Sequence, residues 1–208
     1  MKVPFTSEDI IKASGMHPLK VKNIYIYGSR VYGTARPDSD WDIIIVGMNL
    51  NEHEEHRFTL DNGTLLNIHI YTTDRFKRDL EMHNMMNLEC VFAPEWAVLQ
   101  EKMDFGFELN KKRMVKTLLN ASHNSWRGAK RKLLDCDIYR GLKSVFHSLR
   151  ILMFSNQLGE SDKITDFSES NYLFTEINEC DEIDWSYFKE KYLPFKAELE
   201  KRLKKQMK

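Results

Sequence analysis

Two aspartates and a glycine-serine pair stand close together in the sequence, at a spacing suited to phosphate chemistry. Within the segment from Gly28 to Val46, Gly28 and Ser29 follow one apolar run, and Asp40 and Asp42 begin another. Side chains two residues apart on a strand project from the same face, with Cα atoms about 7 Å apart. Both carboxylates can then close on one hard cation, and Mg²⁺ prefers oxygen ligands at about 2.0–2.1 Å. The pair predicts a site for Mg²⁺ or Mn²⁺.

The glycine-serine pair predicts a turn that binds phosphate. Gly28 lets the backbone bend close to a ligand, Ser29 offers a hydroxyl and an amide, and the following turn points N–H groups at an anion. Arg30 is a second candidate phosphate contact, and Gly33 and Ser39 complete the pattern. We expect these residues to hold the phosphates of a nucleoside triphosphate.

Strands must position this segment. Their β-branched and aromatic content predicts strands at Val21–Tyr27 and Trp41–Val46, the second with the continuous apolar run of a buried strand. Two further strands, Arg57–Leu60 and Leu65–Tyr71, flank Asp61-Asn62-Gly63, which predicts a hairpin whose two central residues have positive φ.

Helix signals complete the expected fold. We expect a short helix capped by Thr6 or Ser7 and ended by Gly15, and another from Thr72 or Thr73 to about Met82. From about residue 107 onward glycine and proline nearly vanish, and apolar residues recur at helical spacing. Residues 162–184 are acidic and read as irregular, and residues 185–208 read as a closing amphipathic helix. The predicted fold is an α/β (α+β) core with a mixed sheet over residues 1–105, followed by a helical domain over 106–208 that closes the active-site cleft.

Composition excludes several classes of protein. The 208 residues are 42% hydrophobic and 12% aromatic, which is enough for a real core. No stretch approaches the roughly 18 consecutive apolar residues of a membrane span, and the start lacks the apolar run of a signal peptide. We therefore expect a soluble cytoplasmic protein with no membrane partner. Cys90, Cys136 and Cys180 stand too far apart for a zinc knuckle or a disulfide framework.

Charge is segregated along the chain although the formal net charge is zero. Residues 1–100 carry 10 basic and 14 acidic side chains, whereas residues 101–156 carry 12 and 5. A basic middle suits a polyphosphate or nucleic-acid ligand, and solvated helix faces are the alternative explanation. The run Arg127–Lys132 beside Trp126 is a candidate RNA or DNA contact through phosphate binding and base stacking.

The segment GSRVYGTARPDSDWDIIIV resembles the signature of the DNA polymerase β-like nucleotidyltransferase superfamily. Gly28, Ser29, Gly33, Asp40 and Asp42 match that signature directly. The resemblance implies that a metal held by the two aspartates grips a nucleoside triphosphate while a hydroxyl attacks the α-phosphorus and pyrophosphate departs.

The resemblance extends to a bacterial and phage group of predicted nucleotidyltransferases. That group has an N-x-x-x-L-E-x-x-F-x-P-like stretch, here Asn84 to Pro94, and a later K-x-x-x-H-x-x-R pattern, here Lys143, His147 and Arg150. The last three residues share one face of a helix and are candidate triphosphate contacts, or else form a solvated basic face.

One position departs from the family. The superfamily usually supplies a third carboxylate from a later strand, and Asn67 stands where we expect it, with His69 two residues on and facing the same side. Three substitutes are open: Asn67 as a neutral ligand, His69 as the base, or Glu89 reaching in from a helix.

Three functions follow from these patterns. The first is a metal-dependent nucleotidyltransferase that transfers a nucleoside monophosphate to a hydroxyl acceptor, which is RNA, a protein or a small molecule. The second, motivated by Asn67, is a nucleotide-binding or partner-binding module whose catalysis has decayed. The third and weakest is an RNA-binding protein that uses the basic middle of the chain.

Overall fold

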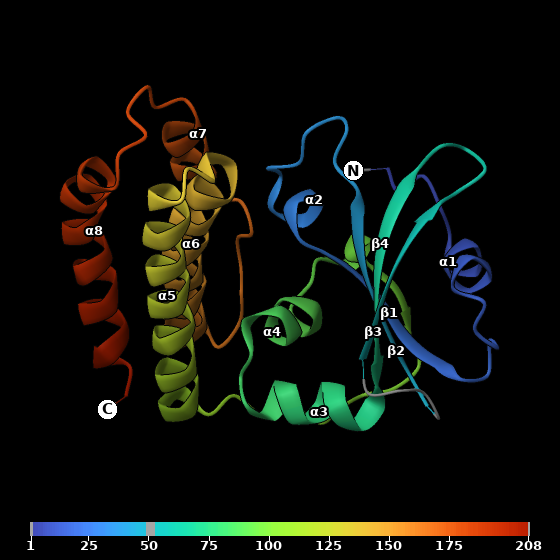
Figure 1. Ribbon diagram of the computed structural model, residues 1–208. Coiled ribbons are helices and arrows are strands. Elements are labelled where there is room, and N and C mark those ends of the chain that lie inside the picture. Colours follow the sequence, from blue (N-terminus) through green and yellow to red (C-terminus); the bar gives the residue numbers. More distant parts are fainter. Residues whose placement is uncertain (1, 49–52, 208) are drawn as a thin grey trace. The chain divides into compact units, whose positions relative to one another are not determined.

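The computed structural model describes residues 2–48 and 53–207, and the chain divides into two compact units, Met1–Glu108 and Leu109–Lys208 (Figure 1). The elements of the first unit are α1 (Ser7–Ser14), β1 (Val21–Tyr27), α2 (Ser29–Tyr32), β2 (Trp41–Gly47), β3 (His53–Thr59), β4 (Leu65–Thr72), α3 (Thr73–Glu81), α4 (Met85–Val91), the 3-10 turn η1 (Glu95–Ala97) and β5 (Val98–Glu101). The elements of the second unit are α5 (Lys111–Leu134), α6 (Ile138–Ser161), α7 (Asn171–Asn178) and α8 (Trp185–Lys205).

The first unit is built on a mixed five-stranded sheet with the order β3-β4-β2-β1-β5. Strands β2 and β4 pair in parallel, while the pairs β1/β2, β3/β4 and β1/β5 are antiparallel. Figure 1 shows α1 on one side of this sheet and α2, α3 and α4 on the other. The mixed sheet followed by a helical region confirms the predicted fold class.

The two faces of the sheet differ in chemistry because side chains alternate along each strand. One face is aliphatic and fully buried, formed by Ile24, Ile26, Ile43, Ile45, Ile68 and Ile70. The other face carries aromatic and polar side chains. On it Tyr25 stacks on Phe76 of α3 with ring centroids 6.0 Å apart, and Tyr71 meets the same ring edge-on at 6.4 Å. Asp42 and His69 belong to this polar face by the same alternation.

Most predicted boundaries of the first unit are confirmed. Thr6 caps α1 through a capping box with Asp9, and Gly15 ends the helix with φ of 68°. Thr72 caps α3 by accepting a hydrogen bond from the N–H of Arg75. Strand β1 spans Val21–Tyr27 as predicted, and β2 is one residue longer than its prediction.

The hairpin between β3 and β4 is confirmed, but its predicted turn is wrong. Only Gly63 has positive φ there, at 81°, and Asn62 does not. The N–H of Gly63 donates to the carbonyl of Leu60 at 2.8 Å, and the N–H of Leu60 donates to the carbonyl of Thr64 at 2.9 Å. The loop is therefore three residues long with one left-handed glycine, which is the next most common hairpin connection after the two-residue turn.

Strand β5 and helix α7 were not predicted. Strand β5 lies at the edge of the sheet beside β1. It has only four residues, which are too few to show a periodic pattern of apolar side chains. Helix α7 lies inside residues 162–184, which we predicted to be irregular. Leu173 and Ile177, four residues apart, are both buried, and this short apolar stripe outweighs the acidic composition around it.

The second unit is helical, as predicted. A three-residue connection, Asp135–Asp137, joins α5 to α6 and makes them neighbours, with Cys136 in the left-handed region at φ of 60°. Helix α8 packs against both, and the amide of Asn156 on α6 donates to the carbonyl of Leu199 at 3.1 Å. Among the described residues, no helix combines the length and the apolar content that a membrane span requires. Closure of an active-site cleft by this unit remains a prediction.

Candidate active site

The glycine of the predicted phosphate turn lies directly against the predicted metal ligand. Gly28 follows Tyr27, the last residue of β1, and Tyr27 is the antiparallel partner of Asp42 on β2. A Cβ atom on Gly28 would lie 2.4 Å from Oδ2 of Asp42. Gly28 also has φ of 78° and ψ of −154°, a region that only glycine adopts readily. Two independent constraints therefore require glycine at this position.

The turn after Gly28 is closed by backbone hydrogen bonds. The N–H groups of Val31 and Tyr32 donate to the carbonyl of Gly28 at 3.0 and 3.2 Å, which builds the single turn α2. Gly33 ends it with φ of 81° and donates to the carbonyl of Ser29. Because the first N–H groups of a helix have no acceptor inside it, the amides at the start of α2 are the groups that this turn offers to an anion.

The two aspartates lie at the beginning of β2, and both are partly exposed. Between them, Trp41 is buried and packs edge-on against Phe5, with ring centroids 5.1 Å apart. Asp42 projects to the opposite face, toward Gly28. A pair of carboxylates fits the oxygen ligands that a hard cation prefers, with bound phosphates and water as the remaining ligands. No cluster of three or more His, Cys, Asp and Glu side chains arranged for a metal ion occurs in the described ranges.

Asn67 and His69 lie beside Asp42 on the parallel strand β4. Asn67 is the register partner of Asp42, and its Nδ2 donates to Oδ1 of Asp42 at 3.2 Å. The same Nδ2 lies 3.2 Å from Nε2 of His69, whose ring meets Tyr27 edge-on at 5.9 Å. Asn67 thus presents its amide nitrogen, and not its oxygen, to the carboxylate of Asp42, the predicted metal ligand.

Tyr27 forms a neutral wall of this site. Burial raises the pKa of its hydroxyl well above the ordinary value of 10.0, and the negative charge of Asp42 raises it further. The hydroxyl of Tyr27 therefore stays protonated, and uncharged, beside Asp42. Sequence reasoning missed this role, although the position of Tyr27 directly before Gly28 on a strand was a usable signal.

Glu89 is held by Tyr32 within the same unit. The hydroxyl of Tyr32 donates to Oε2 of Glu89 at 2.5 Å, and the two residues are only 5% and 4% exposed. Tyr32 is the last residue of α2, so Glu89 on α4 anchors the far end of the phosphate turn. One oxygen of the Glu89 carboxylate therefore already accepts a hydrogen bond from the hydroxyl of Tyr32.

The three candidate triphosphate contacts of α6, Lys143, His147 and Arg150, differ in how far they are exposed. Lys143 is exposed, whereas Arg150 is 6% exposed and donates from Nη2 to Nδ1 of His147 at 2.9 Å. The guanidinium of Arg150 also lies 5.8 and 5.7 Å from the ring centres of Phe146 and Phe154. Burial lowers the pKa of His147 from 6.5 to about 3, assisted by the positive charges of Arg150, Lys143 and Lys132.

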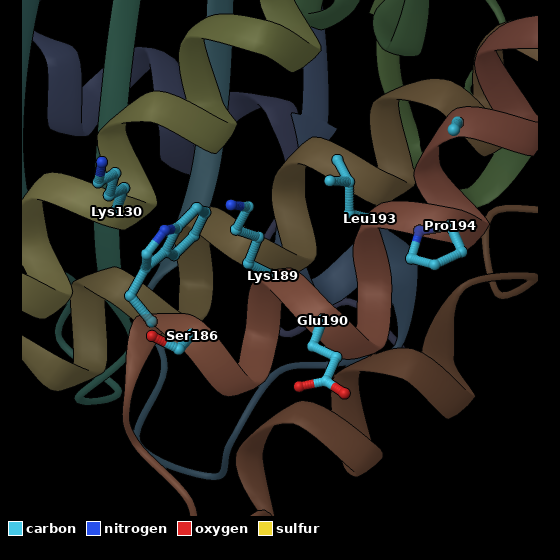
Figure 2. A pocket seen from close by; sticks show the side chains of 8 residues that line it. Lys130, Ser186, Lys189, Glu190, Leu193 and Pro194 are labelled. Atoms are coloured by element: carbon cyan, nitrogen blue, oxygen red, sulfur yellow. The ribbon is translucent and has the colours of Figure 1, made fainter.

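The basic run of α5 does not form a free stacking platform. Trp126 meets Trp185 edge-on at 4.9 Å, and Lys132 donates to Oγ of Ser144 at 2.8 Å. Lys130 lines a groove between α5 and α8 whose lining includes charged, polar and apolar side chains (Figure 2). The other lining residues are Trp185, Ser186, Lys189, Glu190, Leu193, Pro194 and Ala197. The RNA-binding interpretation gains no support from this mixed surface.

Comparison with known proteins identifies the first unit. The model of the family "Polymerase beta, Nucleotidyltransferase" matches residues 8–95. No curated protein sequence matches the chain. A nucleotidyltransferase-like protein from Exiguobacterium sibiricum is 12% identical, with 97% of this chain and 73% of that one covered and a TM-score of 0.38. A spectinomycin adenyltransferase from Enterococcus faecialis, solved with ATP and spectinomycin, is also 12% identical, with 96% and 100% covered and a TM-score of 0.47. Residues 8–95, which make up most of the first unit, therefore match the polymerase β-like nucleotidyltransferase family.

Proposed function

We propose that this protein is an active, metal-dependent nucleotidyltransferase that moves a nucleoside monophosphate from a nucleoside triphosphate to a hydroxyl acceptor. The observation that carries the proposal is the contact between Gly28 and Asp42, where a Cβ would lie 2.4 Å from the carboxylate. The contact places the turn that suits phosphate against the side chain that suits a cation. Phosphate and metal must be adjacent for nucleotidyl transfer, because the cation neutralises the oxygens beside the reacting phosphorus.

Each residue of the site has a role in this reaction. Asp40 and Asp42 bind the divalent cation, and the amides and hydroxyl at the start of α2 bind the outer phosphates of the triphosphate. A bound Mg²⁺ or Mn²⁺ supplies charge neutralisation of the triphosphate and of the leaving pyrophosphate. Asn67 fixes the orientation of Asp42 through its hydrogen bond at 3.2 Å. His69, on the same face of β4, is the proposed acceptor of the proton from the attacking hydroxyl.

Nucleotide turnover provides the test. The full chain is incubated with each labelled nucleoside triphosphate, Mg²⁺ or Mn²⁺, and a panel of RNA, protein and small hydroxyl-bearing acceptors, and pyrophosphate is measured. Pyrophosphate release is expected from the wild type, and Asp40→Asn and Asp42→Asn should abolish it. Asp38→Asn, an exposed aspartate of the same loop, is the matched control and should keep the wild-type rate. Absence of release with every nucleotide and acceptor contradicts the proposal.

A second candidate function is nucleotide binding without transfer, and the orientation of Asn67 favours it. Asn67 brings no negative charge, and its nitrogen faces Asp42, so a second cation has one carboxylate fewer than the family pattern supplies. This function predicts that a nucleoside triphosphate raises the melting temperature of the protein while no pyrophosphate is released. Turnover that depends on Asp42 excludes it.

A further inference from the structure

Arg30 contacts both residues that flank Asp40. The guanidinium Nη2 donates a hydrogen bond to the carbonyl oxygen of Ser39, directly before Asp40. The same guanidinium lies over the ring of Trp41, directly after Asp40, with 4.8 Å between its central carbon and the ring centre. One side chain of the phosphate turn thus bridges the two peptide neighbours of a predicted metal ligand.

These contacts use one N–H group and one flat face of the guanidinium. The Nη2 group donates to the carbonyl of Ser39, and the flat face lies over the ring of Trp41. Lysine cannot make both contacts, because its ammonium group is a point charge without a planar face. The Nε atom of Arg30 is buried and has no hydrogen-bond partner among the described atoms, so this nitrogen does not face solvent as an exposed phosphate contact would.

The loop between α2 and β2 comprises residues 33–40. Its own closing bonds are local, from the N–H of Arg36 to Oγ of Ser39 at 2.9 Å and from the N–H of Ser39 to the carbonyl of Arg36 at 3.1 Å. Trp41 continues the stack to Phe5, at 5.1 Å, and is 6% exposed. Arg30 therefore joins a locally closed loop to a rigid aromatic pair.

We propose that Arg30 is a positioning residue that fixes Asp40 relative to the Gly28–Ser29 turn, and that it is not a phosphate contact. The proposal rests on the proposed function, in which Asp40 binds the cation. A carboxylate whose two peptide neighbours are held in place loses little conformational freedom when it binds a cation. Arg30 and Ser29 are adjacent on α2, so the same turn that binds phosphate also sets the position of the metal ligand.

Metal binding without nucleotide separates this role from phosphate binding. Mn²⁺ affinity is measured by electron paramagnetic resonance on the full chain, for the wild type, Arg30→Lys and Arg30→Gln. Both variants should bind Mn²⁺ about 10-fold or more weakly, because the orientation of Asp40 is lost although Asp40 remains. Their affinity for nucleoside triphosphate in the absence of metal should stay within about 2-fold of the wild type. Arg127→Lys, an exposed arginine of α5, controls for the change of residue type and should match the wild type.

Further variants make every outcome decisive. Trp41→Leu removes the stacking surface while Arg30 remains, and it should also weaken Mn²⁺ binding, whereas Trp41→Phe keeps an aromatic face and should retain most of it. Wild-type Mn²⁺ affinity in Arg30→Lys, or a loss of metal-free triphosphate affinity with Mn²⁺ affinity intact, overturns the positioning role. Mn²⁺ binding that Asp40→Asn and Asp42→Asn do not weaken overturns the metal site itself, and with it the proposed function.

Discussion

The side-chain amide of Asn67 donates a hydrogen bond from Nδ2 to Oδ1 of Asp42 over 3.2 Å. The two residues are direct partners in the only parallel strand pair of the sheet as described, β2 with β4. The amide therefore stabilises the carboxylate of Asp42 by a hydrogen bond without adding a carboxylate of its own. At the position where the superfamily usually has a third acid, this chain has an amide that is hydrogen-bonded to the predicted metal ligand Asp42.

Asn67→Asp should change both stability and turnover. A second carboxylate opposite Asp42 repels it in the metal-free protein, and we expect a loss on the order of 1 kcal/mol in the free energy of unfolding. Mn²⁺ should restore the loss, and pyrophosphate release should rise several-fold because the site gains a negatively charged ligand. Thermal melting with and without Mn²⁺, together with the rate of pyrophosphate release, measures these effects.

Asn67→Ala is the control for that substitution, since it removes the amide without adding charge. It should lower turnover and should not respond to Mn²⁺ as the aspartate variant does. A melting temperature and a turnover rate in Asn67→Asp that both equal those of the wild type would show that this position does not influence the metal site.

Gly28→Ala should inactivate the protein more than its loss of stability explains. The alanine must adopt a strained backbone conformation, which costs about 1–3 kcal/mol. Its Cβ atom also collides with Oδ2 of Asp42. Gly15→Ala shares a positive φ, 68°, but a Cβ there has no neighbour within 4 Å. We therefore expect a lower melting temperature for both variants, with the larger decrease in Gly28→Ala, and at least a 10-fold lower rate of pyrophosphate release for Gly28→Ala alone. Equal rates would contradict the contact.

Tyr32→Phe and Glu89→Gln separate anchoring from catalysis by Glu89. Tyr32→Phe removes the donor to Oε2 and should cost about 1–3 kcal/mol of stability and raise KM for the triphosphate, because the anchor of α2 is lost. Glu89→Gln keeps an accepting oxygen for Tyr32 and should keep kcat within a few-fold. If Glu89 were the missing third carboxylate, Glu89→Gln would abolish turnover as Asp42→Asn does. Steady-state kinetics and thermal melting distinguish the two roles.

His147 should make the protein less stable in mild acid. Burial lowers its pKa in the folded chain from 6.5 to about 3, so between these values the unfolded chain takes up a proton that the folded chain refuses. The free energy of unfolding therefore falls as the pH drops, by about 1 kcal/mol between pH 7 and 5.5. Urea unfolding of the full chain at both pH values measures this, and His147→Gln should remove that part of the loss. An identical pH dependence in the variant would contradict the assignment.

The local parts of the site were predictable from the sequence, whereas its long-range contacts were not. Gly28 and Asp42 were identified because Gly28 follows one apolar run and Asp42 begins the next, and strands β1 and β2 have the predicted bounds to within one residue. Their contact depends on the register that pairs Tyr27 with Asp42, which no spacing in the sequence encodes. Parallel pairing of β2 with β4 likewise decides that Asn67, and no other residue, is the partner of Asp42.

Partners far apart in the sequence were missed for the same reason. Tyr32 and Glu89 are 57 residues apart, and the sequence around either residue does not predict the hydrogen bond between them. Trp126 beside a basic run is typical of a nucleic-acid contact, yet its ring is packed against Trp185. Arg30 next to the phosphate turn is typical of a phosphate contact, yet its guanidinium binds Ser39. In each case the side chain makes a tertiary contact that the sequence pattern does not predict.

Binding of a divalent cation by Asp40 and Asp42 beside the Gly28–Ser29 turn is tested most directly by anomalous diffraction. Crystals of the full chain are soaked with Mn²⁺ and a non-hydrolysable nucleoside triphosphate. We predict a manganese peak in direct contact with a carboxylate oxygen of each aspartate, with the triphosphate against the amides at the start of α2. A manganese peak bound away from these carboxylates, or a triphosphate bound away from Ser29, would contradict the nucleotidyltransferase site.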